Sequence, residues 1–321
     1  MGQRIKFTFL YGFGILIYLI KTGPELSMFS DLKQRLRRRI LGRRFQHRLI
    51  EDHRTLGRLG NAGYLSDHPG LLAPDFDPPF NMHEFSCYSQ NGEDGLILYL
   101  LACVGVESHF VVEIGTEDGR ECNSANLILN YGWRGCLIEA AEHWAEKARE
   151  YFKTCHAADR VKMINARAEP ESINTVLTRA GVPAHIDVLS IDIDSYDYWL
   201  WRALDVVTPR IAVIEYNASF GPVRSVTIPY PRTTAVQPNP MYHGVSLTAL
   251  QKLGESKGYI LVGCDDRGVN SFFVRRDLAE AAGLKAMAPE RAFRPHFWRT
   301  LKMTQEEQYN AVADMPLEEI D

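Results

Sequence analysis

The sequence predicts an α/β fold, a doubly wound and mostly parallel sheet of seven strands with helices on both faces. The first observation is that apolar runs of strand length alternate with helical stretches from residue 89 onward. That alternation is typical of a parallel sheet covered on both faces. The second is that only residues 264–270 separate the last two apolar runs. This connection is too short for a helix, so these two strands should form an antiparallel hairpin at the C-terminal end of the sheet.

The expected elements follow from hydrophobic periodicity and from the glycine and proline residues between them. Strands are expected at 109–114, 135–138, 161–165, 187–191, 210–215, 259–263 and 271–275. Helices are expected near 93–104, 122–131, 141–153, 170–180, 196–205 and 246–257.

Composition restricts the class of protein. The chain has 321 residues, of which 45% are hydrophobic and 24% are charged. This is globular composition and excludes a wholly disordered, collagenous or polytopic membrane protein. The length allows one large domain with extensions or two small domains. The six cysteines form no C-x-x-C pair, which argues against a zinc ribbon or a disulfide scaffold and favours reduced thiols in the cytoplasm.

The charge is divided unevenly along the chain. Residues 1–50 carry 11 Lys/Arg and 2 Asp/Glu, a net charge of +9, and the remaining residues carry 25 and 38, a net charge of −13. The acidic remainder argues against a nucleic-acid partner. Residues 7–20 form an apolar run too short to span a bilayer. Residues 28–50 have the pattern of a basic amphipathic helix, either associated with an anionic membrane surface or packed on the domain. Met28 is an alternative start site.

These patterns predict four parts. Residues 1–50 are the basic head and 51–81 are a linker rich in proline. The α/β domain spans 82–278, with a proline- and aromatic-rich insertion at 218–258 that should act as a lid. Residues 279–321 are a helical C-terminal extension.

Two glycines follow the first expected strand, which ends in Glu113. Gly115 and Gly119 allow a tight turn and a close approach of a ligand to the backbone. The loop lacks the G-x-G-x-x-G pattern of a dinucleotide site and carries Glu117 where that pattern has its second glycine. A carboxylate there would repel a pyrophosphate. The second strand ends in Glu139, which is placed to accept both hydroxyls of a bound ribose.

Further polar residues follow the fourth and fifth strands. Asp192, Asp194 and Asp197 come directly after the fourth strand, and the fifth delivers Glu215 and Asn217 to the same edge. Mutual repulsion among these carboxylates calls for a cation, a shared proton or hydrogen-bond donors.

Two readings of this edge stay open. Asp192, Asp194 and Glu215 form a candidate Mg²⁺ or Mn²⁺ site, to which Asn217 and His243 could contribute; the alternative is a metal-free carboxylate pocket for a polar substrate. His243, the only histidine of the insertion, is either a general base or a structural residue.

These motifs together resemble a known family. The Ser-Gln-Asn-Gly-Glu-Asp run at 89–94, the E-x-G-x-x-x-G turn, the Ile-Asp-Ile-Asp segment and the Ile-Glu-Tyr-Asn strand look like the FkbM-like branch of class I S-adenosylmethionine (SAM) methyltransferases, over residues 86–276. The sequence departs from the branch after the fourth strand, where Asp-Ile-Asp-Ser replaces Asp-x-Glu-Gly. The resemblance implies a cofactor site formed by Gln90, Glu113, Gly115, Gly119, Glu139, Ala166 and Asp192.

The resemblance also implies the function. The expected activity is SAM-dependent O-methylation of a sugar, a glycan or a small polar metabolite, with Asp194, His243 and Glu215 as catalytic residues. The expected location is the cytoplasm, with peripheral attachment to the membrane through 28–50. The alternatives are a methyltransferase-like binding protein without activity and a nucleotide-binding oxidoreductase.

Overall fold

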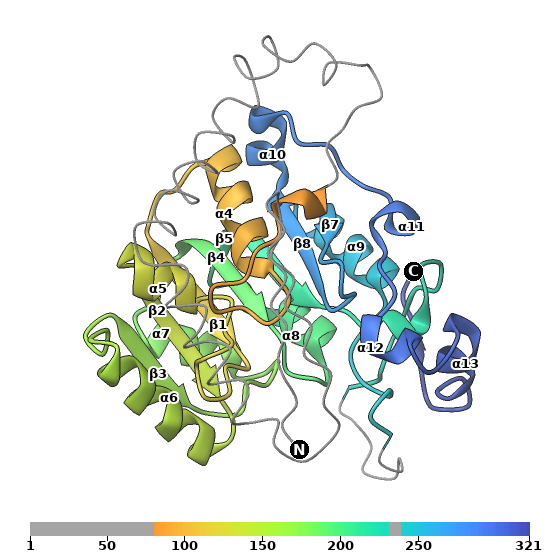
Figure 1. Ribbon diagram of the computed structural model, residues 1–321, viewed down its shortest axis with the longest axis horizontal. Coiled ribbons are helices and arrows are strands. Elements are labelled where there is room, and N and C mark those ends of the chain that lie inside the picture. Colours follow the sequence, from red (N-terminus) through yellow and green to blue (C-terminus); the bar gives the residue numbers. More distant parts are fainter. Residues whose placement is uncertain (1–79, 231–238) are drawn as a thin grey trace, which may run out of the picture. The chain divides into compact units, whose positions relative to one another are not determined.

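The computed structural model describes residues 80–230 and 239–321 (Figure 1). The predicted basic head, nearly all of the predicted linker and residues 231–238 of the predicted lid lie outside the described residues. Among the helices described, none has the length and apolar character required to cross a bilayer.

The central sheet has seven strands in the order β3-β2-β1-β4-β5-β8-β7 (Figure 1). The strands are β1 (Phe110–Ile114), β2 (Arg134–Glu139), β3 (Val161–Asn165), β4 (His185–Ile191), β5 (Thr208–Glu215), β7 (Tyr259–Cys264) and β8 (Asn270–Arg275). β8 runs antiparallel to both neighbours, and the five strands from β3 to β5 are parallel. The predicted fold class, including its C-terminal hairpin, is confirmed.

Helices cover both faces of the sheet because its strands are apolar on both sides. α4 (Glu93–Val104), α5 (Ala125–Tyr131), α6 (Glu142–Thr154) and α10 (Arg276–Ala282) pack on one face. α7 (Ile173–Arg179), α8 (Asp197–Ala203) and α9 (Leu247–Ser256) pack on the other. Successive residues of β1 alternate between the two cores, with Val111 in the first and Val112 in the second.

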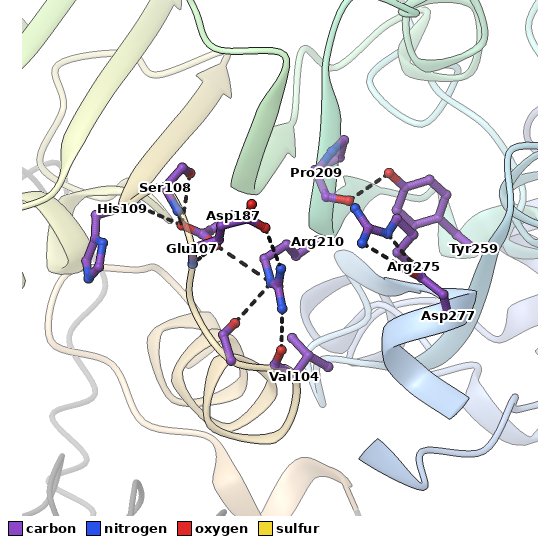
Figure 2. A network of polar contacts seen from close by, with 11 residues as sticks. Val104, Glu107, Ser108, His109, Asp187, Pro209, Arg210, Tyr259, Arg275 and Asp277 are labelled. Atoms are coloured by element: carbon purple, nitrogen blue, oxygen red, sulfur yellow. Dashed lines mark hydrogen bonds and ion pairs between the residues drawn. The ribbon is translucent and has the colours of Figure 1, made fainter. Parts of the chain in front are cut away.

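A buried polar network holds the amino ends of the strands together (Figure 2). The Asp187 carboxylate on β4 accepts hydrogen bonds from the backbone N–H groups of residues 107–109, at 2.7–2.9 Å. Arg210 on β5 lies beside this carboxylate and donates to the carbonyl oxygens of Val104 and Gly105 at the end of α4. The network thus joins α4, β1, β4 and β5 at the edge of the sheet opposite the carboxyl ends.

The segment after β5 packs with the C-terminal extension. β6 (Val226–Thr227) pairs with β9 (Glu318–Glu319), and Phe220, Ile228, Tyr242 and Val312 form a small separate core. The helices that lie wholly within the extension are short: α11 (Pro289–Ala292), α12 (Phe297–Thr300) and α13 (Gln305–Asn310). α10 crosses the predicted boundary at residue 278.

The predicted linker extends slightly too far. The 3₁₀ turn η2 (Phe80–His83) belongs to the packed part of the chain. The Phe80 ring packs on Phe272 of β8 with 5.4 Å between ring centroids.

Candidate active site

A cavity of about 530 Å³ lies at the carboxyl ends of the central strands, within the roughly 300–1,000 Å³ range of small-molecule sites. Most of the residues predicted for the site line it: Gln90, Glu113, Gly115, Glu139, Ala166, Asp192, Asp194 and Glu215. Gly119 and His243 are described by the structure but are not among the lining residues.

The two predicted loop glycines are required for packing. Both have positive φ, 88° at Gly115 and 77° at Gly119. A Cβ atom on Gly115 would lie 1.6 Å from the carbonyl oxygen of Asp192, so the glycine lets the ends of β1 and β4 approach closely. A Cβ atom on Gly119 would lie 2.8 Å from the Phe152 ring on α6. Gly119 therefore lets the loop after β1 pack closely on α6, and its place at the cofactor stays a prediction.

Glu139 lies at the end of β2 and is 8% exposed. One oxygen of its carboxylate accepts the backbone N–H of Glu117 at 2.9 Å, and the other accepts that of Ala141 at 2.8 Å. These bonds orient the carboxylate and hold the loop after β1 against β2. Each carboxylate oxygen can accept a further hydrogen bond, so a ribose hydroxyl can still bind there.

Glu113, on β1, holds the backbone of one wall of the cavity in place. Its two carboxylate oxygens accept the backbone N–H groups of Asn123 and Ser124, both at 2.9 Å. Burial raises the pKa of Glu113. These bonds fix the segment that leads into α5, so Glu113 positions the wall of the cavity.

The start of α4 contributes a residue that the sequence analysis did not select. Glu93 is buried, lines the cavity and accepts a hydrogen bond from the Asn270 amide at 2.9 Å. Its neighbour Asp94 accepts three backbone N–H groups of residues 87–89 at 2.7–2.9 Å, and burial raises the pKa of Asp94 to about 7. Two adjacent acids at the start of an otherwise apolar helix were the signal available in the sequence.

The carboxylates after β4 and β5 form a cluster of Asp192, Asp194 and Glu215. Burial raises the pKa of Glu215 well above its ordinary value, and the neighbouring Asp192 raises it further. Burial likewise raises the pKa of Asp192, with Asp197 and Asp194 adding to the effect. Asp194 differs, because its side chain is 83% exposed and its φ is +52°. It is the most accessible acid of the cluster.

Asp197, which the sequence placed with this cluster, has a structural role. Its buried carboxylate accepts the backbone N–H groups of Ile193 at 2.9 Å and Ser195 at 3.2 Å. Burial raises its pKa to about 6, while the bonds to Ile193 and Ser195 lower it. Asp197 therefore shapes the turn that presents Asp194.

His243 lies behind the carboxylate cluster and is 6% exposed. Its Nδ1 is 3.8 Å from an Asp194 oxygen and 3.9 Å from a Glu215 oxygen. Its Nε2 is 2.9 Å from an Arg299 nitrogen.

Arg299 of α12 lines the cavity and was missed in the sequence. It also donates to the Asn217 amide oxygen at 2.9 Å and to the Ser219 hydroxyl at 3.0 Å. The described part of the predicted lid supplies none of the cavity-lining residues; the C-terminal extension supplies His296 and Arg299. The predicted lid nevertheless brings His243 to the acids, 3.8 Å from Asp194 and 3.9 Å from Glu215.

Three side chains of this region are of the types that ligate a divalent ion. Asp194, Glu215 and His243 can each place one ligand atom so that all lie within 4.8 Å of one another. However, a guanidinium only donates hydrogen bonds, so Nε2 of His243 must be the acceptor and the neutral ring carries its proton on Nδ1. Nδ1 faces the two carboxylates and, when protonated, cannot ligate a metal.

The predicted contribution of Asn217 does not fit a metal either. Its amide oxygen accepts from the Ser219 N–H and from Arg299, and its amide nitrogen donates to the carbonyl oxygens of Met241 and His243. An ion held with the help of Asn217 and His243 therefore does not match this geometry.

The walls of the cavity are strongly acidic. Nine carboxylic acids line it: Glu93, Glu113, Glu117, Asp118, Glu121, Glu139, Asp192, Asp194 and Glu215. Arg299 is the sole Lys or Arg among the lining residues of the described chain. Such a site favours a cationic ligand and disfavours a pyrophosphate.

Comparisons with known proteins concern the fold. No protein-family profile matches the sequence, and no curated protein sequence matches it. Among solved structures, an O-methyltransferase from Bacillus cereus in complex with SAH is 17% identical, with a TM-score of 0.39 over 70% of this chain and 97% of that one. A putative caffeoyl-CoA O-methyltransferase from Staphylococcus aureus is 15% identical, with a TM-score of 0.41 over 69% and 96%. The O-methyltransferase TomG from Streptomyces achromogenes, in complex with SAM, is 20% identical, with a TM-score of 0.38 over 66% and 88%.

Proposed function

We propose that this chain is a SAM-dependent O-methyltransferase. The observation that carries the proposal is an acidic cavity at the carboxyl edge of a sheet with the methyltransferase strand order. SAM bears a sulfonium and an ammonium group against one carboxylate, so its net positive charge suits nine acidic side chains. The pyrophosphate of NAD does not, which argues against the oxidoreductase alternative.

The cofactor would lie across the ends of β1 and β2. Glu139 would accept hydrogen bonds from the ribose hydroxyls, and Ala166 would border the adenine. Gly115 and Gln90 would border the methionine part, as would Glu93, whose carboxylate faces the same cavity. The bound cofactor would supply its methyl group near the carboxylates that follow β4 and β5.

The chemistry follows from the acids at that end. When bound, SAM supplies an electrophilic methyl group on a sulfonium sulfur. The acceptor hydroxyl forms the new C–O bond as the C–S bond breaks, and its proton passes to a base. We assign this role to Asp194 because its carboxylate is exposed in the cavity. His243 and Glu215, which were expected to share the role, are buried beside Asp194, and we expect them to orient the cluster.

The acceptor class is an extension of the same proposal. A sugar, glycan or small polar metabolite is supported by the polar, open end of the cavity and by the sequence resemblance to the FkbM-like branch. Polysaccharide modification at the cytoplasmic face of a membrane would give the basic residues 28–50 a role as a peripheral anchor.

Cofactor binding tests the proposal directly. Isothermal titration with SAM, S-adenosylhomocysteine (SAH) and NAD should show binding of the first two compounds only. Loss of hydrogen bonds to a charged acceptor costs about 1.5–3 kcal/mol, so Glu139→Ala should weaken SAH binding by about 10–150-fold. Glu146→Ala, at an exposed position on α6, is the matched control.

Glu139 also holds two backbone N–H groups, so the fold of the variant must be checked by circular dichroism. Glu139→Gln keeps the size of the side chain and one acceptor oxygen, and it should show an intermediate loss of affinity. Unchanged SAH binding in both variants, or tight binding of NAD by the wild type, would contradict the proposal.

A further inference from the structure

We infer that Arg299 supplies, from within the protein, the positive charge that a divalent ion would otherwise bring to the cluster of Asp192, Asp194 and Glu215. Arg299 is thereby a positioning residue, and the site works without a metal. The inference rests on the proposed function only where it takes this cluster as the end of the cavity at which the acceptor binds.

The contacts of Arg299 define its position. Its guanidinium donates to Asn217 and Ser219, which follow β5, and to Nε2 of His243. Asn217 in turn donates to the backbone carbonyl of His243 at 2.8 Å. Three separate parts of the chain are therefore joined at one point: the end of β5, the segment before α9, and α12.

The same contact decides the state of His243. Because Arg299 can only donate, the lone pair of Nε2 is used and the ring proton lies on Nδ1. The protonated Nδ1 lies 3.8 Å from an Asp194 oxygen and 3.9 Å from a Glu215 oxygen, which are distances of an electrostatic contact rather than of a hydrogen bond. Nδ1 could ligate a metal only after losing this proton. Because Nε2 still accepts the hydrogen bond from Arg299, the ring would then be an imidazolate anion.

Charge supports the same conclusion. Asp194 and Glu215 both interact electrostatically with the Arg299 guanidinium. A divalent ion placed between these acids would have to approach this fixed positive charge, whose repulsion lowers the affinity of the site for the ion.

Manganese binding tests the inference without a known acceptor. Mn²⁺ is titrated into the full-length protein and followed by electron paramagnetic resonance, for the wild type, Arg299→Met and Arg299→Lys. We expect Arg299→Met to bind Mn²⁺ at least about 10-fold more tightly than the wild type, because the acids lose their internal cation. Arg299→Lys keeps the charge and should remain close to the wild type. Lys302→Met, at an exposed position on the same segment, is the control.

Two results would overturn the inference. The first is equal Mn²⁺ affinity, detectable or not, in the wild type and in folded Arg299→Met. The second is tight Mn²⁺ binding by the wild type that is lost in Glu215→Gln. Circular dichroism of the same samples confirms that the variants are folded, and SAH titration reports separately on the proposed function.

The histidine tautomer provides a second measurement. Long-range ¹⁵N–¹H spectra of protein labelled at histidine distinguish a proton on Nδ1 from one on Nε2. His243 should show the Nδ1–H form in the wild type and lose its preference for that form in Arg299→Met. A wild-type spectrum with the proton on Nε2 would show that Arg299 does not donate to His243, and the inference would fall.

Discussion

At the scale of single residues, the acids of the site have two roles. Some hold the surrounding loops in place, and one is placed to accept a proton from a substrate. The carboxylate oxygens of Glu113 and Asp197 accept hydrogen bonds from backbone N–H groups and so fix the loops. Within the cluster of Asp192, Asp194 and Glu215, Asp194 combines a place at the cavity with a side chain that is 83% exposed. The backbone of Asp194 has a left-handed conformation, which is uncommon outside glycine. Such strained conformations concentrate at functional sites.

The first prediction concerns Asp194. General-base assistance contributes about 10²–10⁴ in rate, so Asp194→Asn should lower methyl transfer on that scale while SAM affinity stays unchanged. Transfer of radiolabelled methyl groups from SAM to a panel of sugar acceptors measures the effect. Asp159→Asn, at an exposed position outside the cavity, should behave as the wild type. Near-normal turnover in Asp194→Asn would assign the base elsewhere.

At the scale of elements, the amino ends and the carboxyl ends of the strands have different roles. The amino edge is closed by the network of Asp187 and Arg210, in which buried groups satisfy one another (Figure 2). The carboxyl edge leaves acids facing a cavity. Ligands of doubly wound sheets bind at the carboxyl edge, so rigidity at one edge supports binding at the other.

Removal of the network should therefore destabilise the sheet. Asp187→Ala leaves three backbone N–H groups without their acceptor and removes the carboxylate that lies beside Arg210. Breaking a buried charged pair in this way costs about 3–5 kcal/mol. Urea denaturation should show this loss in the free energy of unfolding, whereas Asp205→Ala, at an exposed site after α8, should change it little. A loss below about 1 kcal/mol would mean that the network contributes little to stability.

At the scale of the whole molecule, the strong division of charge predicts a function for the head. Residues 1–50 lie outside the described part of the chain, so the argument rests on their basic, amphipathic sequence. Basic residues near an anionic surface add about 1 kcal/mol each at low salt. The head should therefore bring the protein to anionic membranes.

Deletion of residues 1–50 tests this expectation. The shortened chain should no longer sediment with anionic vesicles at low salt, and its affinity for SAH should equal that of the full chain. Neutral vesicles serve as the control, because they offer no charge to the head. Equal sedimentation of both chains with anionic vesicles would refute a membrane role.

The sequence by itself determined the order and type of the main elements, because each is encoded by a local pattern. The helix expected at 93–104 and the strand expected at 161–165 have these bounds in the structure. Polar residues directly after strands also mark the carboxyl edge in the sequence, so Glu139, Asp192, Asp194 and Glu215 could be found there. Differences at element ends have tertiary causes: α5 begins at Ala125, after Glu113 binds the N–H groups of the two preceding residues.

Tertiary structure decided which of these residues face the cavity and which other side chains lie beside them. Gly119 contacts Phe152 on a neighbouring helix, and His243 lies behind the acids, because packing directs each side chain independently of its motif. Arg299 meets Asn217 across 82 residues of sequence. No local periodicity encodes such a contact, since it depends on how the C-terminal extension packs against the end of β5. The acids of the site were therefore visible in the sequence, but the cation that balances them was not.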